Sequence, residues 1–146
     1  MPVPATFRRS TESVVLPARA SAVSQARAHL AEALLARQVP PDLVADAQLV
    51  VSELMANAIR HARPLEGDTV RVTWRVLPPD PPRTKPEEVE LAVSDGGAPW
   101  HPRVESPPTD AAGGRGLGIV ATVTEAWGVE GAGSGHQLVW AVLRST

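Results

Sequence analysis

The dominant pattern in the sequence is a stretch from about Asp42 to Ala62 in which apolar residues recur at steps of three and four. This spacing places the apolar residues along one side of a helix, which packs that side onto a core. Pro41 or Asp42 begins the helix, because proline is well tolerated in a first helical turn. The apolar positions are Leu43, Val44, Ala47, Val50, Val51, Leu54, Ala58 and Ile59.

Shorter segments on both sides of this helix carry the spacing of strands or of further helices. Residues 11–17 are predicted to form a first strand, and Pro17 makes it an edge strand because proline cannot donate a ladder hydrogen bond. In the last strand, Leu138, Trp140 and Val142 share one face. The other predicted elements are helices at 21–37 and 119–123 and strands at 69–76, 89–94, 127–130 and 136–144.

The chain reads as one domain with a short arm. At 146 residues it is long enough for a single core. Residues 1–10 are predicted to be a flexible arm and 11–146 one domain. The segment 77–86 holds five prolines in ten residues, which predicts a protruding hairpin insertion. Residues 98–114 form a long loop rich in Pro and Gly, and its length is typical of a lid.

Composition narrows the function classes. The chain has no cysteine, which excludes disulfides, thiolate metal sites and a cysteine nucleophile. The net charge of −2 gives no basic footprint for direct nucleic-acid binding. No apolar run reaches the roughly 20 residues that cross a bilayer, and the N-terminus lacks the apolar stretch of a signal peptide. We therefore expect a cytoplasmic protein without a membrane partner.

The long helix carries the first candidate site. Glu53, Asn57 and His61 recur every four residues and stack beside the apolar stripe. A carboxylate that accepts a proton, one turn from a neutral oxygen ligand, suits a hydrated divalent cation beside an activated hydroxyl. A solvated helix edge is the alternative interpretation. The spacing by itself predicts that His61 is a helix-end side chain rather than a metal ligand.

Two glycine-rich segments follow. Asp95-Gly96-Gly97 closes a predicted strand, so a carboxylate stands where the backbone can come close to a ligand; an ordinary Asp-Gly turn is the alternative. The run 113–118 leads into an apolar helical segment, and free N–H groups at a helix start bind anions. Neither a dinucleotide fingerprint nor a phosphate-binding Gly-Lys-Ser/Thr loop is present.

Taken together and in this order, the three motifs resemble the Bergerat-fold (GHKL) ATP-binding domains, and within them the stand-alone anti-sigma-factor serine kinases. The stretch 53–62 looks like the family's N box, 95–97 like its first glycine box and 114–118 like its second. The resemblance covers about residues 11–143. It implies an α/β (α+β) two-layer sandwich, with helices on one face of a mixed, largely antiparallel sheet.

The resemblance also implies roles for individual residues. Glu53 would be the catalytic base for a protein serine, and Asn57 would hold Mg²⁺ on the phosphates of ATP. Asp95 would accept a hydrogen bond from the adenine amino group, and Gly97 would let the nucleotide come close. The remaining cofactor-binding residues that the motifs imply are His61, Gly114, Arg115, Gly116, Leu117 and Gly118.

The implied function is an ATP-dependent serine kinase that phosphorylates an anti-anti-sigma (STAS-domain) protein and regulates transcription by partner switching. A sigma factor as second partner and a homodimer are options that the sequence leaves open. The alternative is a non-catalytic, nucleotide-responsive module that sequesters a partner. The chain departs from the family in its tight first glycine box, in its insertion at 77–86, and in its closing segment 135–137, which lacks the small hydroxyl residue often found after the last glycine.

Overall fold

The computed structural model describes residues 11–77, 88–97, 112–131 and 136–145, with backbone alone for 112–117. The predicted arm, most of the Pro-rich segment and the predicted lid up to residue 111 lie outside these ranges. The elements are β1 (Glu12–Pro17), the short 3-10 turn η2 (Ala20–Ala22), α1 (Val23–Ala36), α2 (Pro41–His61), β2 (Thr69–Leu77), β3 (Glu88–Asp95), α3 (Ala112–Val123), β4 (Ala126–Glu130) and β5 (Gln137–Arg144).

The strands form one sheet in the order β1-β2-β3-β5-β4, and β1 lies at an edge as its proline predicts. Every pairing among the described strands is antiparallel, so the predicted mixed character is absent from them. The chain passes through α1 and α2 between β1 and β2, and β2 then runs antiparallel to β1. A single helix separates β3 from β4, but β5 inserts between these two strands and runs against both.

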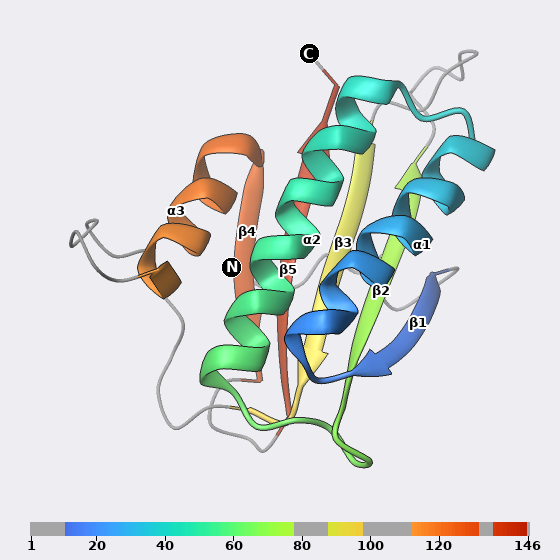
Figure 1. The fold of residues 1–146 in the computed structure, drawn as a ribbon. Coiled ribbons are helices and arrows are strands. Elements are labelled where there is room, and N and C mark those ends of the chain that lie inside the picture. Colours follow the sequence, from blue (N-terminus) through green and yellow to red (C-terminus); the bar gives the residue numbers. More distant parts are fainter. Residues whose placement is uncertain (1–10, 78–87, 98–111, 132–135, 146) are drawn as a thin grey trace.

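The three helices lie side by side over one face of the sheet, with α2 between α1 and α3 (Figure 1). This arrangement confirms the predicted two-layer architecture. Because α2 packs on the sheet and has a helix on either side, its buried surface is wider than one stripe and includes Met55. Each fully buried Leu, Val or Met side chain of this kind stabilises the fold by roughly 1.5–3 kcal/mol.

The last strand shows how the two faces of the sheet differ. Leu138, Trp140 and Val142 share a face as predicted, and they pack with Ala92 and Ala126 in a small cluster on the side away from the helices. The main core receives the alternate residues of β5, which are Val139, Ala141 and Leu143. The hydrophobic residues of β5 therefore serve two separate clusters.

Helix α3 begins earlier than the sequence pattern indicated. It starts at Ala112, so residues 112–114 of the predicted lid and the whole second glycine box belong to its first two turns. The glycines had suggested a loop because glycine disfavours helix by about 1 kcal/mol per residue relative to alanine. In the part of the chain that the structure describes, no helix is both long and apolar enough to cross a membrane.

Candidate functional site

The acid, amide and imidazole predicted on the long helix all lie on the second half of α2. Asn57 is buried, with 5% of its surface exposed, while Glu53 and His61 are half-buried. Burial at Asn57 rules out the solvated helix edge for that residue. A partly exposed carboxylate one turn before a buried amide is an arrangement that can meet a ligand from the open side.

The end of β3 is tied to the end of α2 through backbone hydrogen bonds. The Gly96 N–H donates to Arg63 O at 2.6 Å, and the Arg63 N–H donates to Gly97 O at 2.8 Å. Because Arg63 lies two residues after the last residue of α2, these bonds set the first glycine box beside the N-box helix. The two motifs are thereby held together by the main chain.

The backbone geometry explains why both positions of this box are glycine. A Cβ on Gly96 would lie 2.9 Å from Arg63 O and closer still to the carbonyl oxygen of Pro64, so only glycine fits against that backbone. Gly97 has φ +93°, a left-handed conformation that residues with a Cβ rarely adopt. The Asp-Gly-Gly sequence is therefore more than an ordinary turn, because it brings two backbone segments into close contact behind Asp95.

The Asp95 carboxylate lies at this junction and is almost fully buried, with 1% exposure. Its Oδ1 accepts a hydrogen bond from the Gly97 N–H at 2.7 Å. Burial raises the pKa of the Asp95 carboxyl above its usual range, and hydrogen bonds from Gly97 and from the Gln137 side chain offset part of that rise. Asp95 Oδ2 is buried and has no hydrogen-bond partner among the described residues.

An unpaired buried acceptor of this kind is uncommon in folded proteins and calls for an explanation. The atom can accept a hydrogen bond from an N–H group of a ligand, and the exocyclic amino group of adenine is such a donor. Asp95 therefore fits the role that the resemblance implies for it, on the ground of its own hydrogen-bond geometry.

The second glycine box opens α3. Only Thr124 and Glu125 separate α3 from β4, and β4 runs toward the end of the sheet where Gln137 lies opposite Asp95. The 12 residues of α3 span about 18 Å, so its first turns extend back toward that same end (Figure 1). The backbone of Gly114, Arg115, Gly116 and Leu117 is helical, and the Arg115 and Leu117 side chains lie outside the described part.

Gly118, in the second turn of α3, has no packing reason to be glycine. A Cβ built on it would meet no atom of the described residues within 4 Å. Since α3 packs beside α2, this open position lies on the helix layer that also carries Glu53 and Asn57. An open glycine near a helix N-terminus leaves room for a phosphate group to approach the backbone.

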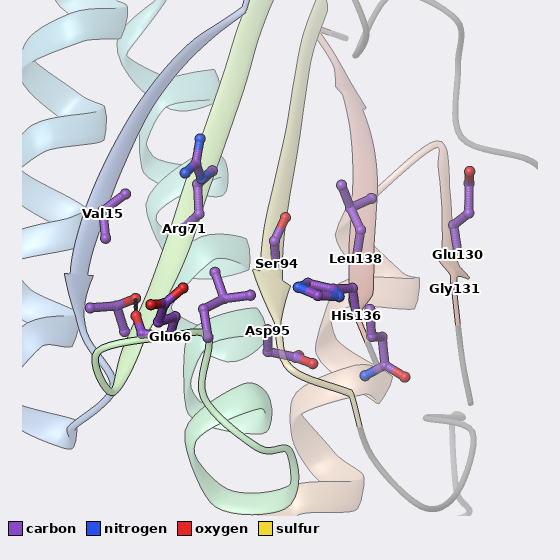
Figure 2. A pocket seen from close by; sticks show the side chains of 12 residues that line it. Val15, Glu66, Arg71, Ser94, Asp95, Glu130, Gly131, His136 and Leu138 are labelled. Carbon is purple, nitrogen blue, oxygen red and sulfur yellow. Dashed lines mark hydrogen bonds between the residues drawn. The ribbon is translucent and has the colours of Figure 1, made fainter. Parts of the chain in front are cut away.

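A hollow of about 680 Å³ lies at the same end of the sheet, mainly on the face turned away from the helices (Figure 2). None of the described residues of α2 lines it. The acid and the amide thus lie on the other face, and we place the candidate site between α2, α3 and the end of β3. The hollow is lined by Val15, Leu65, Glu66, Thr69, Arg71, Ser94, Asp95, Glu130, Gly131, His136, Gln137 and Leu138.

Gln137 is a residue of the candidate site that is not among those predicted from the sequence, where the segment 135–137 differs from the family only by lacking a small hydroxyl residue. It lies directly opposite Asp95 in the β3–β5 register and is 2% exposed. A signal was present, because Gln137 is the polar member of the series Gln137, Val139, Ala141, Leu143, which alternation places on one face. The sequence prediction used the opposite face, with Leu138, Trp140 and Val142, and therefore did not include Gln137.

The described side chains do not include three or more His, Cys, Asp or Glu residues grouped to hold a metal ion. The cation prediction therefore rests on Asn57 together with the phosphates of a nucleotide. An amide oxygen is a ligand that Mg²⁺ accepts, and Mg²⁺ usually takes only one or two protein ligands when phosphates are present.

Comparison with known proteins agrees with the fold. Among solved structures, the chain is similar to the crystal structure of the RsbU and RsbW domains of Rv1364c from Mycobacterium tuberculosis, with a TM-score of 0.61 and 18% identity. The match covers 92% of this chain and 32% of that one, so this chain spans about a third of that chain's length. A comparison with curated protein sequences finds no match.

The family comparison is more specific. The family described as "Histidine kinase-like ATPase domain" matches residues 16–141, which include the N-box helix and both glycine boxes. The description names an ATPase domain, so ATP is the nucleotide that membership implies. With most of its length matched, the chain belongs to the histidine kinase-like ATPase domain family.

Proposed function

We propose that this protein is a serine kinase of the anti-sigma-factor type, which transfers the γ-phosphoryl group of ATP to a serine of an anti-anti-sigma (STAS-domain) protein. The observation that carries the proposal is the pair on α2, a half-buried Glu53 one turn before a buried Asn57. A module that only binds nucleotide needs a phosphate cradle and a base-recognition group, but it needs no proton acceptor beside them.

In this proposal Glu53 takes the proton from the serine hydroxyl as its oxygen attacks. A bond forms between the serine oxygen and the γ-phosphorus, and the bond from that phosphorus to the β–γ bridging oxygen breaks, so ADP leaves with the electron pair. Asn57 holds Mg²⁺, which supplies positive charge for the phosphate oxygens when it is bound. Phosphoryl transfer depends mainly on positioning and charge stabilisation, so these few groups suffice.

The remaining residues position the nucleotide. Asp95 accepts a hydrogen bond from the adenine amino group at Oδ2, while the Gly97 N–H keeps the carboxylate in place through Oδ1. The first turn of α3 offers backbone N–H groups, and Gly118 in the next turn leaves space for the phosphates. Phosphorylating a STAS partner and releasing or capturing a sigma factor would make the protein a regulator of transcription by partner switching.

The test is phosphoryl transfer from labelled ATP, in the presence of Mg²⁺, to a panel of STAS-domain proteins. Glu53→Gln retains the size and most of the hydrogen bonding, so nucleotide binding should persist while transfer falls by roughly 10²–10⁴-fold. Asn57→Ala should instead weaken Mg²⁺-dependent ATP binding itself. Glu32→Gln makes the same chemical change at an exposed position of α1 and should alter neither property.

Transfer by Glu53→Gln at the wild-type rate would refute the assigned base. If the wild type binds ATP and a partner but no label reaches serine on any of the proteins, the protein is the non-catalytic, nucleotide-responsive module instead. Thermal unfolding of each variant shows whether a loss reflects chemistry or a damaged fold.

A further inference from the structure

Gln137 and Asp95 form a buried polar pair across two central strands. They lie directly opposite each other in the β3–β5 register, and their side chains are 2% and 1% exposed. Strand alternation puts them on the helix-covered face, in line with Val93 and Val139, which belong to the core. The pair therefore occupies the position at which the core ends and the candidate site begins.

Each residue of this pair has one buried oxygen without a hydrogen-bond partner in the described part of the chain. Gln137 donates to the Asp95 carboxylate through its side-chain nitrogen. This fixes the orientation of the amide, because a carboxylate accepts hydrogen bonds and an amide oxygen placed against it would be repelled. Gln137 Oε1 and Asp95 Oδ2 are both buried, and neither has a partner within the described ranges.

A ligand that presents two donors would pair both of these acceptors. The exocyclic amino group of adenine carries two hydrogens on one nitrogen, and each of them can be donated to an acceptor. We infer that Gln137 is a second base-recognition residue, whose Oε1 accepts one hydrogen of the adenine amino group while Asp95 Oδ2 accepts the other. This inference rests on the proposed ATP binding and extends it to a residue of the segment 135–137, in which the sequence departs from the family.

The arrangement selects against other purines. Guanine presents a carbonyl oxygen where adenine presents the amino group, so two protein acceptors would face a third acceptor. Sites built to hydrogen-bond a particular substrate group reject analogues that lack it, because their buried polar atoms are then left unpaired. Gln137 would therefore contribute to the preference for ATP over GTP.

The test compares wild type and Gln137→Leu by titration with three triphosphates: ATP, N6-methyl-ATP and purine riboside triphosphate, which lacks the amino group. Leucine is similar in size and removes the Oε1 acceptor. We expect Gln137→Leu to bind ATP about five- to tenfold more weakly, the value of one hydrogen bond. Its affinity for purine riboside triphosphate should be unchanged or higher. Ser94→Ala, next to Asp95 on the opposite face of β3, is the control and should retain the wild-type values.

N6-methyl-ATP separates direct recognition from an effect through Asp95. It has only one amino hydrogen, so the wild type should prefer ATP to it, and this preference should shrink about five- to tenfold in Gln137→Leu. An unchanged preference, or equal losses for all three nucleotides, would refute direct recognition and leave Gln137 a structural role. Thermal unfolding identifies a variant that fails to fold, and Gln137→Met then repeats the comparison. A wild type that binds no nucleotide would overturn ATP binding itself, and this inference with it.

Discussion

Gly118 allows the structural and functional roles of the second glycine box to be separated with one substitution. It lies inside α3, where glycine is less favourable than alanine by about 0.5–1 kcal/mol. A Cβ at this position would meet nothing within 4 Å in the part of the chain that the structure describes. Gly118→Ala should therefore stabilise the nucleotide-free protein by about 0.5–1 kcal/mol, which raises Tm by roughly 1.5–3.5 °C for a domain of this size.

With ATP present, the stability gained by Gly118→Ala should be reversed. If phosphates approach the helix at Gly118, the added methyl group occupies part of their space, and overpacking of this kind costs about 1–3 kcal/mol. ATP affinity should then fall by roughly five- to 150-fold. Mg-ATP at a hundred times its wild-type Kd stabilises the wild type by about 2.7 kcal/mol, and Gly118→Ala should lose much of this stabilisation.

The assay is thermal unfolding with and without Mg-ATP, supported by direct titration of ATP. Ala121→Gly is the matched control, because Ala121 is an exposed residue of the same helix. It should lose up to about 1 kcal/mol of stability and keep its ATP affinity. Wild-type ATP affinity in Gly118→Ala would refute the phosphate role of Gly118, and a lower Tm without nucleotide would show that the space beside it is not open.

Four further outcomes, from three variants, follow from the site and the core. Burial raises the pKa of Asp95, so ionisation of this carboxyl destabilises the wild type as pH rises through the folded-state pKa. Asp95→Asn has no carboxyl to ionise, so its stability relative to the wild type should increase from below pH 3.8 to pH 7 in parallel thermal melts. The same variant should lose ATP affinity by titration, because its oxygen stays on the Gly97 N–H and its NH₂ group then faces the adenine amino group. Gly96→Ala should cost about 1–3 kcal/mol or more in denaturant unfolding, since its Cβ would press on rigid backbone oxygens, and a neutral result would contradict the close approach. Leu54→Ala, at a position 1% exposed in the core, should cost about 2–5 kcal/mol by the same measurement, and a loss under 1 kcal/mol would show that α2 packs loosely.

The sequence by itself determined the elements and the positions of the motifs. Period-two and period-3.6 patterns are local properties, so they located β1, α2 and the central strands within one or two residues of their observed bounds. Proline located the edge strand and the start of α2 for equally local reasons. The same logic was misleading at α3, where four glycines between 113 and 118 suggested a loop, whereas the chain is helical from Ala112.

Only the tertiary structure decided how these pieces meet. Alternation showed that β5 has two faces, but the packing of the helices determined that Val139 rather than Trp140 faces the main core. The need for glycine at position 96 comes from a backbone segment more than thirty residues away, at Arg63, and no local pattern contains it. The pairing of Gln137 with Asp95 likewise depends on strand register, because hydrogen bonds between distant segments, and not neighbouring residues, bring two buried acceptors to one place.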